Sequence, residues 1–311
     1  MIVETARKLD GTATARTIRD EVARGVAAFR ERLGMTPGLS VVLVGDDPAS
    51  HVYVRGKEKA AREVGITSKV LRLPATTGEA EILEIVRGLN ADRAVHGILV
   101  QLPLPRGVNE RRVLDAVDPA KDVDGFHPIN AGRLLVGLPG LVPCTPAGIL
   151  ELLKRHRIPL AGKRAVVVGR SNIVGKPVAV LLLREHCTVT IAHSKTVDLP
   201  AVCREADLLV AAIGRPAFVR GDFIKPGAVV VDVGVNALTS EDEIRAVFGD
   251  DAKRLATLRE RGSVLCGDVH PGEAAVKAGW LSPVPGGVGP LTIAMLLSNT
   301  LEAASRCSAS A

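Results

Sequence analysis

Seven short apolar runs recur along the chain, and amphipathic helical patterns separate most of them. Such an alternation predicts βαβ units, in which parallel strands form a sheet that helices cover. Aromatic residues make up only 2% of the 311 residues, so Val, Leu, Ile and Ala must fill the core, as they do in covered parallel sheets. We therefore expect an α/β fold. The expected strands are residues 39–44, 70–73, 94–100, 165–168, 189–192, 208–213 and 229–233.

The series of expected strands divides once, between residues 101 and 163. This passage is rich in proline and glycine, and it leads into one helix that Thr145 would cap and Pro146 would begin. We expect two domains with a cleft between them. Residues 1–145 would form an α/β catalytic domain, completed by a C-terminal helix within 285–311, and residues 146–284 would form a Rossmann domain. The charged stretch 241–261 is expected to be an exposed helical insertion.

Composition and charge narrow the range of functions and cellular locations that we expect. The net charge of +6 is spread along the chain without a basic run, which disfavours nucleic acid and suits small anionic metabolites. The five cysteines lack disulfide or zinc-ligand spacing, so we expect a reducing compartment and no metal. The chain has neither a signal-like apolar core at its start nor an apolar stretch long enough to span a bilayer, and we expect a cytoplasmic protein without a membrane partner.

Tyr53 and Lys57 lie four residues apart, just after the first expected strand and its turn. If the segment after Pro48 is a helix, both side chains leave one face of it at the carboxyl end of a strand, where open α/β sheets place their sites. In short-chain dehydrogenases a Tyr-x-x-x-Lys pair follows the nucleotide-binding turn, whereas here the pair precedes it. We therefore expect the pair on a separate domain that faces the cofactor; an incidental surface pair is the alternative.

A glycine-rich turn, residues 169–175, follows the fourth expected strand and precedes a helix expected to begin near Pro177. Its Gly-x-Ser-x-x-x-Gly pattern departs from the usual dinucleotide fingerprint, and a plain tight turn is the alternative. About twenty residues later, where NAD enzymes place a ribose-binding acid, the chain has none. Arg170 and Ser194 could instead contact a 2′-phosphate, which favours NADP. The candidate cofactor residues are Gly169, Arg170, Ser171, Gly175, Ser194, Ile213 and Val235.

Three glycines and three prolines crowd residues 283–290, ahead of a helical pattern at 291–301. Such a composition specifies an unusual backbone path, which a plain connecting loop would not need. We expect a loop that lines a ligand site, with Pro285, Gly286 and Gly287 as candidate substrate-binding residues.

Taken together, six collinear motifs resemble the bifunctional methylenetetrahydrofolate dehydrogenase/methenyltetrahydrofolate cyclohydrolase family. The departures from the family pattern are the long stretch 237–265, where a short turn is usual, and Ser282 in place of threonine. Neither departure touches the reactive residues. The motifs are Val44-Gly45 through Ser50-x-x-Tyr53-x-x-x-Lys57, then residues 97–105, 121–126, 143–146, 169–177 and 283–290.

The resemblance implies oxidation of 5,10-methylenetetrahydrofolate with NADP and hydrolysis of the methenyl product to 10-formyltetrahydrofolate. These reactions belong to one-carbon metabolism and serve purine biosynthesis. It also implies a homodimer and tetrahydrofolate derivatives as partners. Lys57 would activate water, a role open only to its neutral form, which a neighbouring substrate cation favours. Four further roles are implied: Gln101 would orient Lys57, Tyr53 would stack on the folate, Asp124 would bind the amino-pyrimidine edge of the pterin, and Ser50 would support the site or cap the helix.

Three alternatives remain at this point. A monofunctional dehydrogenase would lose the hydrolysis, although Lys57 and Gln101 are both present. An amino-acid or hydroxy-acid dehydrogenase would need a carboxylate-clamping arginine or a catalytic histidine in the first domain, and no convincing candidate stands out. A redox-sensing NADP-binding regulator would keep the nucleotide turn but would have no use for Tyr53, Lys57, Gln101 and Asp124 together.

Overall fold

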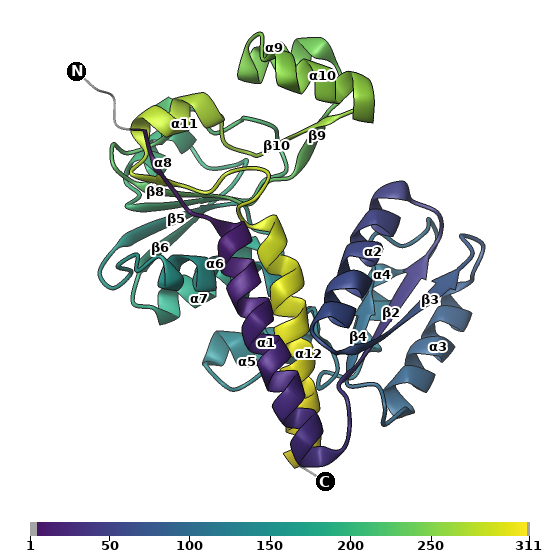
Figure 1. Cartoon of the computed structure of the whole chain (residues 1–311). Helices are drawn as coiled ribbons and strands as arrows, with labels where there is room; N and C mark the ends of the chain where they lie inside the picture. The colour runs from purple at the N-terminus through teal and green to yellow at the C-terminus, as the bar shows by residue number, and fades with distance from the viewer. Residues whose placement is uncertain (1–4, 310–311) are drawn as a thin grey trace. The chain divides into compact units, whose positions relative to one another are not determined.

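The computed structural model describes residues 5–309, and its helices and strands alternate along most of the chain (Figure 1). The chain divides into two compact units. The three-stranded unit contains Ala15–Cys144 and the chain from Thr292 onward, and the six-stranded unit contains the chain up to Thr14 together with Thr145–Leu291. Two of the three boundaries therefore fall inside long helices, α1 (Gly11–Leu33) and α12 (Gly289–Ala309), and the third follows the first residue of α6 (Cys144–Arg155).

The three-stranded unit is built on a parallel sheet of order β3-β2-β4. Every residue of the central strand β2 is buried, which explains why the strand is apolar apart from Gly38 and the buried Ser40. Val42, Val44 and Ile98 on one face of this sheet pack against Ile82 and Val86 of α3. The elements are β2 (Gly38–Val44), α2 (Pro48–Glu63), β3 (Thr67–Leu73), α3 (Glu79–Ala91), β4 (Gly97–Val100), α4 (Glu110–Asp115) and α5 (Pro128–Val136).

The same unit holds most of α1 and α12. The two helices lie side by side in Figure 1, and a Cβ at Gly25 of α1 would come within 2.6 Å of Leu301 of α12. Glycine at this position thus permits a close approach of the two helices. Gly25 and Leu301, which are 276 positions apart in sequence, are packed together in this way.

The six-stranded unit carries a parallel sheet of order β1-β11-β8-β7-β5-β6. The first of its longer strands, β5, lies between β6 and β7, so the strand order reverses there, and ligands bind at such a reversal in doubly wound sheets. One face is covered by α8, η1 and α11 and the other by α6 and α7 (Figure 1). The elements are β1 (Arg7–Lys8), α6 (Cys144–Arg155), β5 (Arg164–Val168), α7 (Gly175–Arg184), β6 (Thr188–Ala192), α8 (Leu199–Arg204), β7 (Leu208–Ala211), η1 (Gly221–Phe223), β8 (Val229–Asp232), α11 (Pro271–Lys277) and β11 (Trp280–Leu281).

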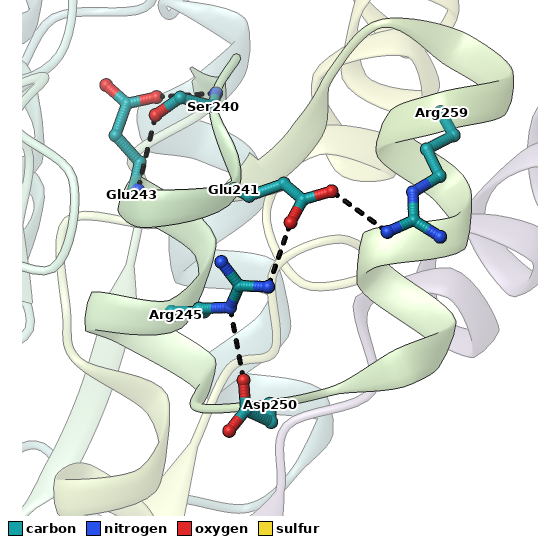
Figure 2. A network of polar contacts seen from close by, with 6 residues as sticks. All are labelled: Ser240, Glu241, Glu243, Arg245, Asp250 and Arg259. Atoms are coloured by element: carbon teal, nitrogen blue, oxygen red, sulfur yellow. Dashed lines mark hydrogen bonds and ion pairs between the residues drawn. The ribbon is translucent and has the colours of Figure 1, made fainter.

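The charged stretch after β8 forms a helical insertion, as predicted. An antiparallel ladder of β9 (Asn236–Leu238) and β10 (Val264–Cys266) supports α9 (Glu241–Phe248) and α10 (Ala252–Arg261). Glu241 accepts hydrogen bonds from Arg245 at 2.9 Å and from Arg259 at 3.0 Å, which joins the two helices (Figure 2). Ser240 and Glu243 form a capping box that begins α9. A small apolar core, which includes Leu238, Ile244 and Val264, lies beneath this network.

All seven expected strands are present, and several helix boundaries differ from expectation. The helix expected to begin at Pro146 begins at Cys144, and the one expected near Pro177 begins at Gly175. The C-terminal helix expected at 291–301 extends over Gly289–Ala309. None of the helices in residues 5–309 is long and apolar enough to cross a membrane.

Candidate active site and nucleotide turn

Helix α2 positions the Tyr53 and Lys57 pair of the three-stranded unit. Pro48 lies in its first turn and Asp47 is its N-cap, accepting the Ser50 amide at 2.8 Å and the Ser50 hydroxyl at 2.7 Å. Ser50 is therefore a buried partner of the cap and is not the cap itself. The helix leaves Tyr53 49% exposed and Lys57 only 9% exposed. The phenol is thus available to a ligand, whereas the amine lies inside the protein.

The amine of Lys57 donates a hydrogen bond of 2.9 Å to Oε1 of Gln101, 44 residues away in sequence. Gln101 directly follows β4, and its backbone amide donates to the carbonyl of Val42. Its Nε2 donates to the Leu102 carbonyl at 2.7 Å. Because an ammonium group only donates, the amide must direct its oxygen to Lys57, and the Leu102 carbonyl holds it in that orientation. Gln101 is therefore placed to orient Lys57.

Asp124 belongs to the same electrostatic cluster. Burial raises the pKa of Asp124 from 3.8 to about 6; the positive charge of Lys57 opposes this rise and Asp122 adds to it. Asp122 is buried and accepts the His127 amide at 2.8 Å, so it shapes the loop that carries Asp124. The structure thus brings Lys57, Gln101 and Asp124 together in one unit, with Tyr53 one turn before Lys57 on α2.

Two residues that the sequence reasoning missed hold the backbone beside Asp124. Asn299 on α12 is buried, and its Nδ2 donates to the carbonyls of Val123 at 2.8 Å and Val142 at 2.9 Å. The thiol of Cys144 also donates to the Val123 carbonyl, at 3.2 Å, and burial raises the pKa of this thiol well above its ordinary range. An asparagine within the apolar pattern of residues 291–301 was the available signal, because buried amides need partners.

The glycine-rich turn of the six-stranded unit has the form that a nucleotide site needs. Gly169 has φ 126°, and a Cβ there would lie 2.1 Å from the Ala212 carbonyl oxygen. A Cβ at Gly175 would lie 2.3 Å from the Gly169 carbonyl oxygen. Ser171 Oγ accepts the amides of Val174 at 3.1 Å and Gly175 at 3.2 Å, which closes the turn ahead of α7. The bare backbone at the start of a helix fits a pyrophosphate group.

The other candidate cofactor residues lie at the carboxyl ends of neighbouring strands. Ser194 follows β6, Ile213 follows β7 and Val235 follows β8, while Arg170 follows β5 within the turn. Because parallel strands end at one edge of their sheet, these residues share the edge that carries the turn. Arg170 and Ser194 are exposed. Sequence reasoning missed Asp232 and Asp268 at this edge. Asp232 directly follows the apolar residues of β8, which was a visible signal, whereas Asp268 follows no such run.

The loop at residues 283–290 is held by the start of α1. The amide of Thr12 donates to the Gly286 carbonyl at 3.0 Å, and its hydroxyl donates to the same oxygen at 3.3 Å. Gly286 has φ 101°, and a Cβ at Gly11 would lie 1.6 Å from the Gly287 carbonyl oxygen. The Val284–Pro285 peptide is cis. The loop thus has a fixed path, as its composition predicted, and it belongs to the six-stranded unit, whereas Lys57 and Asp124 belong to the other.

The fold and the two sites define a class of α/β enzyme that combines a buried lysine–amide pair with a dinucleotide-binding sheet. Family models agree with this class: residues 9–124 match the catalytic domain of tetrahydrofolate dehydrogenase/cyclohydrolase, and residues 143–308 match its NAD(P)-binding domain. The chain therefore belongs to the tetrahydrofolate dehydrogenase/cyclohydrolase family. This confirms the resemblance inferred from the six motifs and the expected two-part α/β fold.

Relatives named bifunctional protein FolD are similar over nearly the whole chain. The one from Koribacter versatilis is 56% identical over 296 residues, which cover 95% of this chain and 96% of that protein. The one from Solibacter usitatus is 55% identical over 300 residues and covers 96% and 98%.

Two solved structures of such enzymes are also similar. The bifunctional FolD enzyme of Campylobacter jejuni has a TM-score of 0.87 at 43% identity, covering 97% of this chain and 99% of that one. The dehydrogenase–cyclohydrolase of Trypanosoma brucei, complexed with NADP cofactor and inhibitor, has a TM-score of 0.88 at 38% identity, covering 98% and 99%.

Proposed function

We propose that this chain oxidises 5,10-methylenetetrahydrofolate with NADP and then hydrolyses the 5,10-methenyl cation to 10-formyltetrahydrofolate. Family membership and the relatives named bifunctional support both activities. The observation that carries the proposal is the 2.9 Å hydrogen bond between Lys57 and Gln101 in the unit that also holds Asp124. A dehydrogenase without hydrolysis has no need of this pair.

The oxidation depends mainly on how the folate and the nicotinamide are aligned. Lone pairs of the two nitrogens that flank the one-carbon unit drive hydride loss, so the protein contributes mainly by holding the reacting groups in register. NADP, when bound, supplies the hydride acceptor. The turn from Gly169 to Gly175, which contains Arg170 and Ser171, would hold its phosphates. Ser194, Ile213 and Val235 would line the rest of its site. Arg170 and Ser194 would contact the 2′-phosphate, for which a guanidinium group and a hydroxyl are suitable donors.

The hydrolysis requires an activated water. Lys57 in its neutral form accepts a proton as the water oxygen bonds to the methenyl carbon, and the cationic substrate favours that neutral form. Breaking the bond from this carbon to N5 leaves the formyl group on N10, with one proton released overall. Gln101 keeps Nζ of Lys57 in place through its fixed amide oxygen. The site thus uses one amine for hydrolysis without needing it for hydride loss.

We assign substrate recognition to Asp124, Tyr53, Ser50 and the loop at residues 283–290. Asp124 would accept two hydrogen bonds from the amino-pyrimidine edge of the pterin, and the exposed ring of Tyr53 would stack on the folate. Ser50 would support the start of α2. The loop with Pro285, Gly286 and Gly287 would contribute its fixed backbone.

We assign residues 1–145 and the C-terminal helix to folate chemistry and residues 146–284 to NADP. A homodimer completes the proposal, and sedimentation equilibrium tests it.

One absorbance assay separates this proposal from two alternatives, a monofunctional dehydrogenase and an NADP-binding regulator. With methylenetetrahydrofolate and NADP or NAD, reduced cofactor and the methenyl intermediate are followed as separate signals. The proposal expects reduced NADP to form while methenyl is consumed. Lasting accumulation of methenyl at the pace of NADP reduction would favour a monofunctional dehydrogenase, and failure to reduce either cofactor would favour an NADP-binding regulator.

A further inference from the structure

Two buried carboxylates at the nucleotide edge of the six-stranded sheet have no part in the function proposed above. Asp232 ends β8 and is 4% exposed, and Asp268, between β10 and α11, is 0% exposed. A buried carboxylate must be well hydrogen-bonded to offset its desolvation. The groups that donate hydrogen bonds to Asp232 and Asp268 therefore show which parts of the chain these carboxylates hold.

Asp232 organises the segment that carries Asp268. Its Oδ1 accepts the amides of Gly234 at 3.0 Å and Asp268 at 2.8 Å, and its Oδ2 accepts the amide of Val269 at 2.9 Å. All three donors are backbone groups. Asp232 thus ties the loop after β8 to the chain that follows β10.

Asp268 in turn organises the loop after β7. Its Oδ2 accepts the amides of Ile213 at 2.7 Å and Gly214 at 3.0 Å, and its Oδ1 accepts the amide of Arg215 at 2.8 Å. Three consecutive backbone amides therefore point at one carboxylate, more than fifty residues away in sequence. Such an arrangement fixes the backbone path of the loop, because each amide would otherwise need its own partner.

Two glycines make room for this arrangement in a reciprocal manner. A Cβ at Gly267 would lie 1.8 Å from Oδ2 of Asp232, and a Cβ at Gly234 would lie 2.3 Å from Oδ1 of Asp268. Each carboxylate thus occupies the space that a side chain on the other segment would need. Any residue larger than glycine at either position would displace a carboxylate from its donors.

The helical insertion begins at the same place. Asn236 is the first residue of β9 and pairs with Cys266 of β10. Its Nδ2 donates to Oδ1 of Asp268 at 3.0 Å and to the Cys266 carbonyl at 3.3 Å. The ladder that supports α9 and α10 is therefore hydrogen-bonded to the carboxylate that holds the loop after β7.

We propose that Asp268 is a positioning residue for the cofactor, that it fixes loop 213–215 before the cofactor binds, and that Asn236 couples the helical insertion to this loop. The inference rests on the proposed function, which places Ile213 and Val235 at the NADP site. A loop fixed in advance binds its ligand without the loss of conformational entropy that a mobile loop incurs. Asp268 touches no cofactor atom in this account and acts through the backbone it holds.

Asp268→Asn tests the proposal. The substitution keeps the shape of the side chain, but it replaces one accepting oxygen with an NH₂ group, which cannot accept a hydrogen bond from the backbone amides. The Kd and KM for NADP should rise by about tenfold, with kcat at saturating NADP within about threefold of the parent. Asn236→Ala removes one of the four donors to Asp268 and should raise both by about threefold. Cyclohydrolase turnover, assayed without NADP, reports whether each variant is folded.

Glu273→Gln is the matched control. Glu273 is another carboxylate of the six-stranded unit that accepts a backbone amide, that of Gly221 at 2.7 Å, but it holds η1. Its variant should leave the KM for NADP unchanged. A folded Asp268→Asn with parental Kd for NADP would overturn the proposal, and if that variant does not fold, a parental Kd in Asn236→Ala would overturn it equally. A parent protein that hydrolyses methenyltetrahydrofolate but binds no NADP would instead contradict the proposed function.

Discussion

The proposed contact between Asp124 and the pterin predicts that folate binding depends on pH in a range where exposed carboxylates do not titrate. Burial raises the pKa of Asp124 to about 6, and only the ionised form would accept both proposed hydrogen bonds from the amino-pyrimidine edge. Roughly nine tenths of the group is ionised at a pH of about 7 and roughly one tenth at about 5. The Kd for tetrahydrofolate should therefore rise about tenfold between these two values.

Calorimetric titration with tetrahydrofolate under anaerobic conditions, from pH about 5 to about 8, measures this change. Asp124→Asn should bind weakly throughout and lose the inflexion near 6. Asp122→Asn is the matched control: it removes a neighbouring charge that raises the pKa of Asp124, so the inflexion should move to lower pH but persist. An Asp124→Asn variant that keeps the parental pH profile would refute the assignment of the titrating group.

The raised pKa of Asp124 also makes the free energy of unfolding depend on pH. Because the folded-state pKa of Asp124 lies above 3.8, the fold favours the protonated form. The resulting contribution to stability is fully present below the ordinary pKa and is lost as pH rises through about 6. Denaturant unfolding at several pH values should therefore show that Asp124→Asn is less sensitive to pH than the parent in this window.

Three further predictions concern other parts of the molecule. Arg170→Ala should raise the KM for NADP far more than the KM for NAD, and equal losses in steady-state kinetics would count against a 2′-phosphate contact. Gly169→Ala should destabilise the protein by about 2–4 kcal/mol, because of its φ of 126° and a Cβ 2.1 Å from the Ala212 carbonyl oxygen. By contrast, Gly88→Ala on α3, where a Cβ meets nothing within 4 Å, should stabilise it by about 0.5–1 kcal/mol; similar denaturation midpoints for the two variants would contradict this reasoning. Asn299→Leu should cost about 1–3 kcal/mol in chemical denaturation and raise the KM for methylenetetrahydrofolate, since the carbonyls of Val123 and Val142 lose the amide donor; parental values for both would show that the amide is dispensable.

The sequence revealed those parts of the fold in which burial leaves a local pattern. Strand β2 is buried on both faces, so its residues are apolar at almost every position, with Ser40 as the polar exception. Strands β1 and β11 have two residues each, and the pairing of Arg7 with Trp280 that defines them joins opposite ends of the chain. No local sequence pattern predicts that pairing. Strands of two residues form only because a neighbouring strand supplies their hydrogen-bond partners.

In the candidate site, too, a local sequence pattern reveals some residues and not others. Tyr53 and Lys57 could be read from helical spacing, because four residues bring side chains to one face. The Lys57–Gln101 hydrogen bond joins two elements 44 residues apart, and only the motif resemblance pointed to it. The roles of Asn299 and Asp268 depend on backbone groups far away in sequence, and composition gives no indication of which backbone groups a buried side chain will meet.

In the proposed mechanism, Lys57 accepts the proton in the hydrolysis and is not required for hydride transfer. The most direct test is to measure both activities in Lys57→Met and Lys57→Arg, following reduced NADP and methenyltetrahydrofolate separately. Both variants should lose the hydrolysis by a factor of about 10²–10⁴, retain dehydrogenase turnover and accumulate methenyltetrahydrofolate. Arginine fails despite its charge, because a guanidinium group stays protonated and its planar fork cannot replace a point amine. If Lys57→Arg hydrolysed methenyltetrahydrofolate at close to the parental rate, Lys57 would not be the proton acceptor.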